Sequence, residues 1–227
     1  MNLFNSNNNK FNDCKKIICL GNKTKLGFLL IKTLREIVCK KKINLCINEY
    51  YDSKEFFSKN NLSIKENISN EKVIVVFCAT GGVRTENHST DKAKSSLKYD
   101  LSLLRHLIKY SDEIQVIYIS SVLGLINSKK NIDYSFSKRM AEIELKKVLV
   151  DYENIRGLSI IYPGRLINNW LKFFISGSIT YKRLVEIIIK VISKKVNLNY
   201  CLTGLDAFIF LLIKRPRLLK DLSLRII

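Results

Sequence analysis

Three side chains in the middle of the chain are of types that can bind or move a proton: Ser121, Tyr134 and Lys138. Tyr134 and Lys138 are four residues apart, so that in a helix they lie one turn apart on the same face. Ser121 follows a short apolar segment that is typical of a strand, which places its hydroxyl at the end of that strand. A phenol beside an ammonium group, with a hydroxyl nearby, has the chemistry of a proton-transfer site.

The elements that must position these residues follow from the pattern of apolar side chains, which predicts strands that alternate with helices. We expect strands at 15–20, 43–47, 73–77, 115–119, 155–162 and 198–202. We expect helices at 28–39, 94–110, 133–150, 181–193 and 205–213, and a short helix and a brief strand at 62–64 between residues 50 and 70. This order predicts an α/β fold, a doubly wound, mostly parallel sheet with helices on both faces, in a Rossmann-like three-layer α/β/α domain.

A loop with two glycines joins the first predicted strand to the first predicted helix. Gly21 and Gly27 are six residues apart, and glycines in such a loop let the backbone approach a pyrophosphate that rests on the helix N-terminus. The second predicted strand ends at Asn48 and Glu49, where an acid that binds the ribose of a dinucleotide is expected. Two glycines alone also fit an ordinary turn, so both interpretations stay open.

Small or polar residues directly follow four of the predicted strands. They are Gly21, the segment 79–82, Ser120 with Ser121, and Pro163 with Gly164. Ligands of open parallel sheets bind at the carboxyl ends of the strands. Because the four segments would meet at one edge of the sheet, together they predict a ligand site more strongly than any one of them does.

These residues together resemble the short-chain dehydrogenase/reductase family over roughly residues 15–202. The family's glycine loop, its Tyr-x-x-x-Lys pair and a Pro-Gly after the following strand have counterparts here in the same order. Ser121 stands thirteen residues before Tyr134, which matches the family's common short form. The tyrosine–lysine pair is weak evidence by itself, because Tyr50 and Lys54 have the same spacing in a region without the other motifs of the family.

The resemblance implies an NAD(P)-dependent oxidoreductase that transfers a hydride between a nicotinamide cofactor and a carbonyl compound or secondary alcohol. Tyr134 would be the general acid/base, Lys138 would favour its phenolate and hold the nicotinamide ribose, and Ser121 would bind the substrate oxygen. The residues expected at the cofactor, NAD or NADP, are Gly21, Lys23, Lys25, Leu26, Gly27, Glu49, Ala79, Thr80, Gly81, Tyr134, Lys138, Pro163 and Gly164.

The glycine loop departs from the family's pattern at one position. Lys25 stands where a further glycine is usual, and its side chain could crowd the pyrophosphate or pair with a phosphate instead. Lys23 and Lys25 favour a 2′-phosphorylated cofactor, whereas the carboxylate of Glu49 would repel that phosphate. The choice between NAD and NADP therefore stays open.

Two further departures leave other functions open. The family's active-site asparagine has no clear match, with Ser96 and Asp100 in its neighbourhood, and the segment that would form a substrate lid is short, with Trp170, Phe173 and Phe174 as its bulky residues. These aromatic residues form either a small lid or part of the core. The alternative functions are a nucleotide-sugar epimerase or dehydratase, for which the C-terminal region leaves little room, and a non-catalytic dinucleotide-binding or regulatory protein of the same fold.

Length and composition set the class of protein. With 227 residues, of which 47% are hydrophobic and 26% charged, the chain is long enough to bury a sizeable core in one domain. Its apolar runs are shorter than the about 20 residues that cross a bilayer, and its first residues lack a secretory signal. We expect a disordered leader at 1–14, the NAD(P)-binding domain with the substrate site at 15–204, and a C-terminal helix with a basic tail at 205–227.

The formal net charge of +19 could indicate a polyanionic partner. The lysines are scattered and the chain is rich in Asn and Ile, which favours compositional bias, so we expect no nucleic-acid partner. Apolar and basic residues mix in 205–227, which leaves a peripheral membrane contact open. The 6 cysteines lack metal-binding spacing, which predicts no metal and a reduced, cytoplasmic protein. The resemblance also favours a homo-oligomer with a small-molecule substrate.

Overall fold

The computed structural model describes residues 16–59, 71–80, 89–126, 132–150, 152–167, 178–193 and 201–214. A six-stranded parallel sheet, in the order β2-β1-β3-β4-β5-β8, forms its centre. The strands are β1 (Lys16–Leu20), β2 (Cys46–Tyr50), β3 (Lys72–Phe77), β4 (Glu113–Ile119), β5 (Ile155–Pro163) and β8 (Cys201–Thr203). A separate parallel pair joins β6 (Leu166–Ile167) to β7 (Ile179–Thr180).

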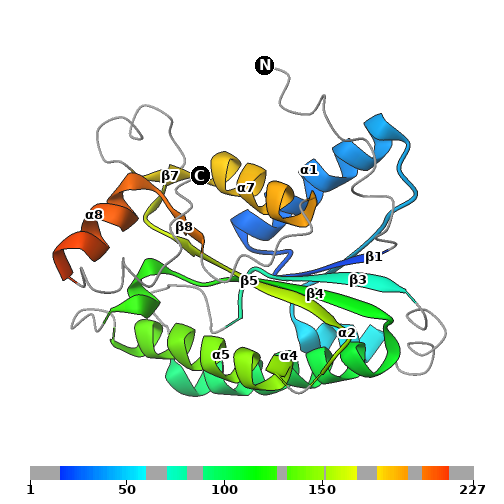
Figure 1. The fold of residues 1–227 in the computed structure, drawn as a ribbon, viewed down its shortest axis with the longest axis horizontal. Helices are drawn as coiled ribbons and strands as arrows, with labels where there is room; N and C mark the ends of the chain where they lie inside the picture. The colour runs from blue at the N-terminus through cyan, green and yellow to red at the C-terminus, as the bar shows by residue number, and fades with distance from the viewer. Residues whose placement is uncertain are drawn as a thin grey trace.

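Helices cover both faces of the sheet (Figure 1). On one face lie α1 (Lys25–Lys41) and α7 (Tyr181–Ser193), and on the other lie α2 (Ser53–Lys59), α4 (Thr90–Tyr110), α5 (Ile132–Val150) and α8 (Leu205–Lys214). A 3-10 turn, η1 (Val122–Leu125), follows the end of β4. The predicted doubly wound, three-layer α/β/α fold is confirmed.

Strand β3 shows why the apolar runs form the centre of the sheet. Its alternate residues point to opposite faces, so Val75 and Phe77 pack in the core beneath α4 and α5, while Ile74 and Val76 pack beneath α1 and α7. A parallel strand between two helical layers has no solvent-facing side. The continuous apolar sequence of β3 follows from that burial.

Several predicted boundaries are wrong. The second strand was expected at 43–47 but lies at Cys46–Tyr50. Helix α1 runs to Lys41, its C-cap Lys42 is left-handed (φ 50°), and Ile43 N–H still bonds back to Val38 O, so these residues belong to the helix end. Helix α1 begins three residues before the predicted start because Thr24 caps it, and α4 begins four residues early, at Thr90. The predictions for residues 1–14, 62–64, 168–177 and 215–227 lie outside the described residues.

The sheet order creates a crevice at the carboxyl ends of β1 and β3, because the chain leaves β1 toward β2 on one side and returns to β3 on the other. Gly21 ends β1 with a φ of 94°, and a Cβ on it would lie 3.0 Å from Ala79 Cβ. A Cβ on Gly27, in the first turn of α1, would lie 2.1 Å from the Gly21 carbonyl oxygen. Both glycines are therefore needed for close backbone packing at this crevice.

The substitution Gly27→Ala tests this packing. Alanine is favoured over glycine in a helix by about 1 kcal/mol, but the added methyl group would meet backbone that cannot move freely. We expect the clash to dominate and the free energy of unfolding, measured by urea denaturation, to fall by about 2 kcal/mol. Lys32→Ala, at an exposed position of the same helix, is expected to change it by less than about 0.5 kcal/mol. Equal stability of Gly27→Ala and wild type would contradict the packing.

Candidate active site

Lys138 is buried at the carboxyl edge of the sheet, with 3% of its surface exposed. Its Nζ donates to the carbonyl oxygens of Thr80, at 2.8 Å, and Ile119, at 3.3 Å. Thr80 follows β3, and Ile119 is the last residue of β4. The backbone carbonyl of Lys138 accepts a hydrogen bond of 3.1 Å from Tyr118 Oη. Lys138 thus fastens helix α5 to the ends of two neighbouring strands.

Tyr134 lies one turn before Lys138 in α5 and is half-buried. The Lys138 ammonium is 5.8 Å from the centre of the Tyr134 ring, so the structure brings these two predicted residues together. The pair formed by Tyr50 and Lys54 is different, because Tyr50 ends strand β2 while Lys54 lies in helix α2. Equal spacing in the sequence therefore gives two different geometries.

Ser121 lies two residues past the end of β4, where it caps η1. Its Oγ accepts a hydrogen bond of 3.3 Å from Leu123 N–H. The η1 turn packs on α5 beside Lys138: a Cβ on Gly124 would lie 3.3 Å from Lys138 Cβ, and Arg139 Nε donates to the Gly124 carbonyl at 3.2 Å. The structure therefore places Ser121 at the same sheet edge as Lys138.

A buried carboxylate is linked to Lys138 through Thr80. Asp100 of α4 accepts hydrogen bonds from Ser53 Oγ at 2.5 Å and from Thr80 Oγ1 at 2.6 Å. Thr80 connects the two charged groups, since its hydroxyl donates to Asp100 while its carbonyl accepts from Lys138. Four elements of the fold, α2, α4, α5 and the loop after β3, therefore meet in one hydrogen-bonded cluster.

Burial shifts the titration of both charged groups in this cluster. It raises the pKa of Asp100 to about 6, although the bonds from Ser53 and Thr80 and the charge of Lys138 lower it, while Asp52 raises it further. Burial also lowers the pKa of Lys138 to about 8, against the opposing influence of Cys78 and Asp100. Each group thus titrates closer to neutral pH than in water.

The glycine loop is held rigidly at the crevice. Thr24 Oγ1 donates to the Gly21 carbonyl at 2.7 Å and accepts from Gly27 N–H at 3.0 Å. The N–H groups of Gly21 and Asn22 both donate to the Tyr50 carbonyl, at 2.9 and 3.1 Å. The side chain of Leu26, which was also predicted at the cofactor, is buried in the core beneath α1. Only the backbone of this residue is therefore near the loop.

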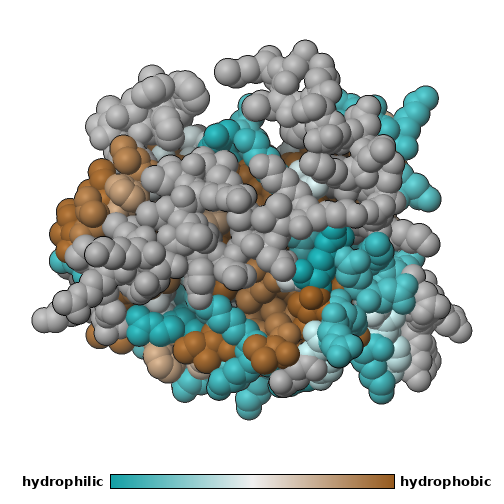
Figure 2. All heavy atoms as spheres, viewed as in Figure 1, coloured by the Kyte–Doolittle hydropathy of each residue, from teal (hydrophilic) through white to brown (hydrophobic). Residues whose placement is uncertain are grey.

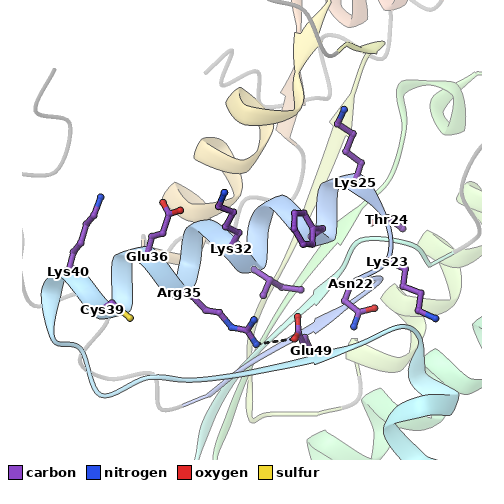
Figure 3. Close-up of a pocket in the computed structure, with 12 residues that line it drawn as sticks. Asn22, Lys23, Thr24, Lys25, Lys32, Arg35, Glu36, Cys39, Lys40 and Glu49 are labelled. Atoms are coloured by element: carbon purple, nitrogen blue, oxygen red, sulfur yellow. Dashed lines mark hydrogen bonds and ion pairs between the residues drawn. The ribbon is translucent and has the colours of Figure 1, made fainter.

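The two lysines of the loop point in different directions (Figure 3). Lys25 Nζ lies 5.3 Å from the centre of the Tyr181 ring, in α7, and Lys23 Nζ lies 4.9 Å from that of Tyr51, beyond β2. Lys25 is therefore turned toward α7 rather than across the loop, and the crowding that its side chain could cause is not seen in this conformation.

Glu49 lies inside β2 and pairs with Arg35 of α1 at 2.9 Å. Both line a cavity of about 1030 Å³ that runs along the outer side of α1 (Figure 3). The described residues that line it are Asn22, Lys23, Thr24, Lys25, Phe28, Ile31, Lys32, Arg35, Glu36, Cys39, Lys40 and Glu49. Three predicted cofactor residues, Lys23, Lys25 and Glu49, therefore line the cavity. Ser121, Tyr134 and Lys138 are not among its described lining residues.

The remaining predicted residues lie at or just after the carboxyl ends of β3 and β5. Ala79 lies against Gly21 and Thr80 in the buried cluster, while Gly81 is outside the described residues. Pro163 is the last residue of β5, and Gly164 N–H donates to the Thr203 carbonyl at 3.1 Å.

Asp206 of α8 holds the loop after Pro163. Its Oδ2 accepts from Arg165 N–H at 2.7 Å. A Cβ on Gly164 would lie 2.2 Å from Asp206 Oδ1, so this contact requires glycine.

The sequence-based prediction missed the roles of Ser53, Arg35 and Asp206, and noted Asp100 only for its neighbourhood. Asp100 had a detectable signal, because it lies between Leu97 and Leu101 on the apolar face of α4. The others are contacts between distant segments, for which the sequence holds no signal. Of the described residues, no group of three or more His, Cys, Asp or Glu could hold a metal ion, and the five described cysteines are free.

Comparisons with solved structures show similarity of fold. A 3-alpha-hydroxysteroid dehydrogenase from Pseudomonas sp. B-0831, complexed with NADH, has a TM-score of 0.62 at 12% identity, over 89% of this chain and 99% of that chain. A small-chain dehydrogenase in complex with NADPH has a TM-score of 0.59 at 12% identity, over 86% and 98%. A short chain dehydrogenase from Salmonella enterica has a TM-score of 0.56 at 10% identity, over 82% and 92%.

The chain therefore has the fold of the short-chain dehydrogenases, in agreement with the resemblance inferred from its motifs. No protein-family model matches the sequence, and a search of curated proteins gives no match. At these identities the likeness concerns the fold, and the roles of individual residues stay predictions.

The buried cluster predicts a distinctive pH dependence of stability. Because the folded pKa of Asp100, about 6, exceeds the ordinary value of 3.8, the folded chain retains a proton between these values that the unfolded chain has released. This contribution to stability is present at pH 4 and is lost as the pH rises through 6. A shift of about two units corresponds to about 3 kcal/mol.

Asp100→Asn removes this titration and preserves the shape of the side chain, while its amide nitrogen must donate to one of the two hydroxyls, Ser53 and Thr80, that donate to the carboxylate in wild type. We expect the unfolding free energy of wild type, relative to the variant, to decrease between pH 4 and pH 7 by about 2 kcal/mol in urea titrations, because part of the full effect lies below pH 4. Asp91→Asn, an exposed acid of the same helix, serves as the control. Parallel pH curves for wild type and Asp100→Asn would rule out the titration.

Proposed function

We propose that this protein is an NAD(P)-dependent oxidoreductase that acts on a carbonyl compound or a secondary alcohol. The observation that carries the proposal is the position of the Lys138 ammonium, fixed on the carbonyls of Thr80 and Ile119 and near the Tyr134 ring. This pair lies at the carboxyl edge of a doubly wound sheet, where such folds bind their ligands. Two solved structures of similar fold contain NADPH or NADH.

The crevice at β1 and β3 fits a dinucleotide in one specific respect. The glycine at position 21 leaves no side chain between the loop and Ala79, and Gly27 lets the first turn of α1 approach it. The first turn of a helix offers N–H groups and a positive dipole end to phosphate oxygens. Gly21 and the first turn of α1 would hold the pyrophosphate, and Lys138 the nicotinamide ribose. The bound nicotinamide would supply the hydride-transfer chemistry.

The residues of the chain would handle the proton and the developing charge. Tyr134 would donate a proton to the substrate oxygen or accept one from it, and the neighbouring Lys138 cation would stabilise the phenolate. Ser121, fixed by its capping of η1, would donate a hydrogen bond to the same oxygen. With its pKa at about 8, Lys138 would remain mostly charged at pH 7 and lose its charge in mild alkali.

The variant Tyr134→Phe tests the acid/base role. General acid–base catalysis contributes about 10²–10⁴-fold to rates, so we expect kcat to fall by this factor against a panel of carbonyl compounds. Cofactor affinity, measured by fluorescence titration, is expected to stay within about twofold, because the phenol does not carry the phosphate contacts. Tyr152→Phe, at an exposed position, provides the control. If wild type turns over a substrate and Tyr134→Phe retains full kcat, the role is wrong.

The surroundings of Glu49 favour NADP over NAD. Arg35 neutralises the carboxylate at 2.9 Å, and Lys23 and Lys32 line the same cavity. An arginine near this position accommodates a 2′-phosphate. We expect NADPH to bind about tenfold more tightly than NADH, and Arg35→Ala to weaken NADPH by about tenfold while it changes NADH by less than about twofold. Lys40→Ala, at the far end of the cavity, is the matched control.

These titrations also separate the enzyme from a non-catalytic protein of the same fold. Binding of either nucleotide without turnover of any substrate would leave a dinucleotide-binding protein. Failure to bind NADH and NADPH would remove both interpretations.

A further inference from the structure

Helix α8 is apolar on two opposite sides. Ala207 and Leu211 are buried in the core beside β8. The opposite side carries four exposed side chains, Leu205 (60% exposed), Ile209 (45%), Leu212 (50%) and Ile213 (70%), which we call the α8 stripe. Their spacing places them on one helical face, and Figure 2 shows the corresponding brown area at the left, over α8. A helix that is apolar all round is normally covered on all sides.

Cations adjoin both ends of the α8 stripe. Exposed Arg165 lies at the start of the helix, where its backbone N–H bonds to Asp206, and exposed Lys214 is the last helical residue. The sequence continues with Arg215, Arg217, Lys220 and Arg225 and a single acid, Asp221. Asp206, the acid of the helix itself, is engaged by the N–H groups of Arg165 and Ala207. Of the described residues, Arg165 and Lys214 therefore place a positive charge at each end of the α8 stripe.

We propose that the α8 stripe docks in the plane of an anionic lipid bilayer, with the adjoining cations on the lipid headgroups. Aliphatic side chains on one face of a helix with basic residues beside them form the pattern that binds such surfaces. A second copy of this chain is a poorer partner for the α8 stripe, because it would bring together two chains that each have a net charge of +19 and cations, Arg165 and Lys214, beside this surface. In the described part of the chain, no helix is long and apolar enough to cross a membrane.

Co-sedimentation of the full chain with vesicles tests the proposal without any need for turnover, so its outcome is independent of the proposed oxidoreductase activity. Vesicles of phosphatidylcholine alone are compared with vesicles of equal parts phosphatidylcholine and phosphatidylserine. We expect the partition coefficient to be at least about tenfold higher on the anionic vesicles and to fall with added salt. Lys214→Glu is expected to weaken binding to the anionic vesicles by about fivefold or more.

The variant Ile209→Asn/Leu212→Asn/Ile213→Asn removes most of the α8 stripe, and we expect it to lower the partition coefficient by at least about tenfold. Ile143→Asn/Val150→Asn, at exposed positions of α5, is the control and is expected to bind like wild type. Circular dichroism verifies that each variant folds, and the single variant Ile213→Asn replaces the triple variant if the latter does not.

Three outcomes would overturn the proposal. The first is that wild type does not sediment with the anionic vesicles. The second is that the folded stripe variant sediments as well as wild type. The third is that the stripe variant converts a dimer to a monomer in sedimentation velocity while vesicle binding is absent, which would identify a second copy of the chain as the partner.

Discussion

The arrangement of this molecule depends on the ammonium of Lys138 and the two carbonyl oxygens that it binds at the ends of β3 and β4. Parallel strands leave their last carbonyls at the carboxyl edge, where an unpaired acceptor is costly when water is excluded. Lys138 satisfies the last carbonyl of β4, at Ile119, and the carbonyl of Thr80, which follows β3, and these two bonds hold α5 against this edge of the sheet. The position of α5 in turn places Tyr134, one turn earlier, near the Lys138 ammonium. It also places the η1 turn, which packs against the same segment of α5.

A buried ammonium needs a compensating negative charge or dipole, and the cluster supplies both. Thr80 bonds to Lys138 through its carbonyl and to Asp100 through its hydroxyl, so one residue couples the two charges. Burial disfavours each ionised form, whereas their mutual attraction favours both, which leaves the pKa of Asp100 at about 6 and that of Lys138 at about 8. Near pH 7 both groups are therefore mostly charged, although each is close to its titration range.

The fold could be predicted from the sequence because apolar runs such as that of β3 have only one stable location, between two helical layers. The bounds of β2 could not be predicted, since the apolar pattern already begins at Ile43, whereas the end of α1, with its C-cap at Lys42, decides where the strand begins. Tyr134 and Lys138 were predictable because helical spacing brings them together. The pairing of Arg35 with Glu49 was not, because it joins a helix to a neighbouring strand through long side chains whose direction no local rule gives.

Asp206 connects the proposed membrane surface to the sheet edge without a bond to Ser121, Tyr134 or Lys138, the residues of the proposed proton transfer. Its carboxylate accepts hydrogen bonds from Arg165 N–H and from Ala207 N–H, so the first turn of α8 is tied to the loop after β5. Asp206 also packs closely against Gly164, where a Cβ would lie 2.2 Å from Asp206 Oδ1. A displacement of α8 by a bilayer would therefore reach the Pro163–Gly164 loop first. Lys138 has no such direct tie to α8, because its ammonium bonds to the carbonyls of Thr80 and Ile119, which follow β3 and end β4 on the other side of β5 from β8.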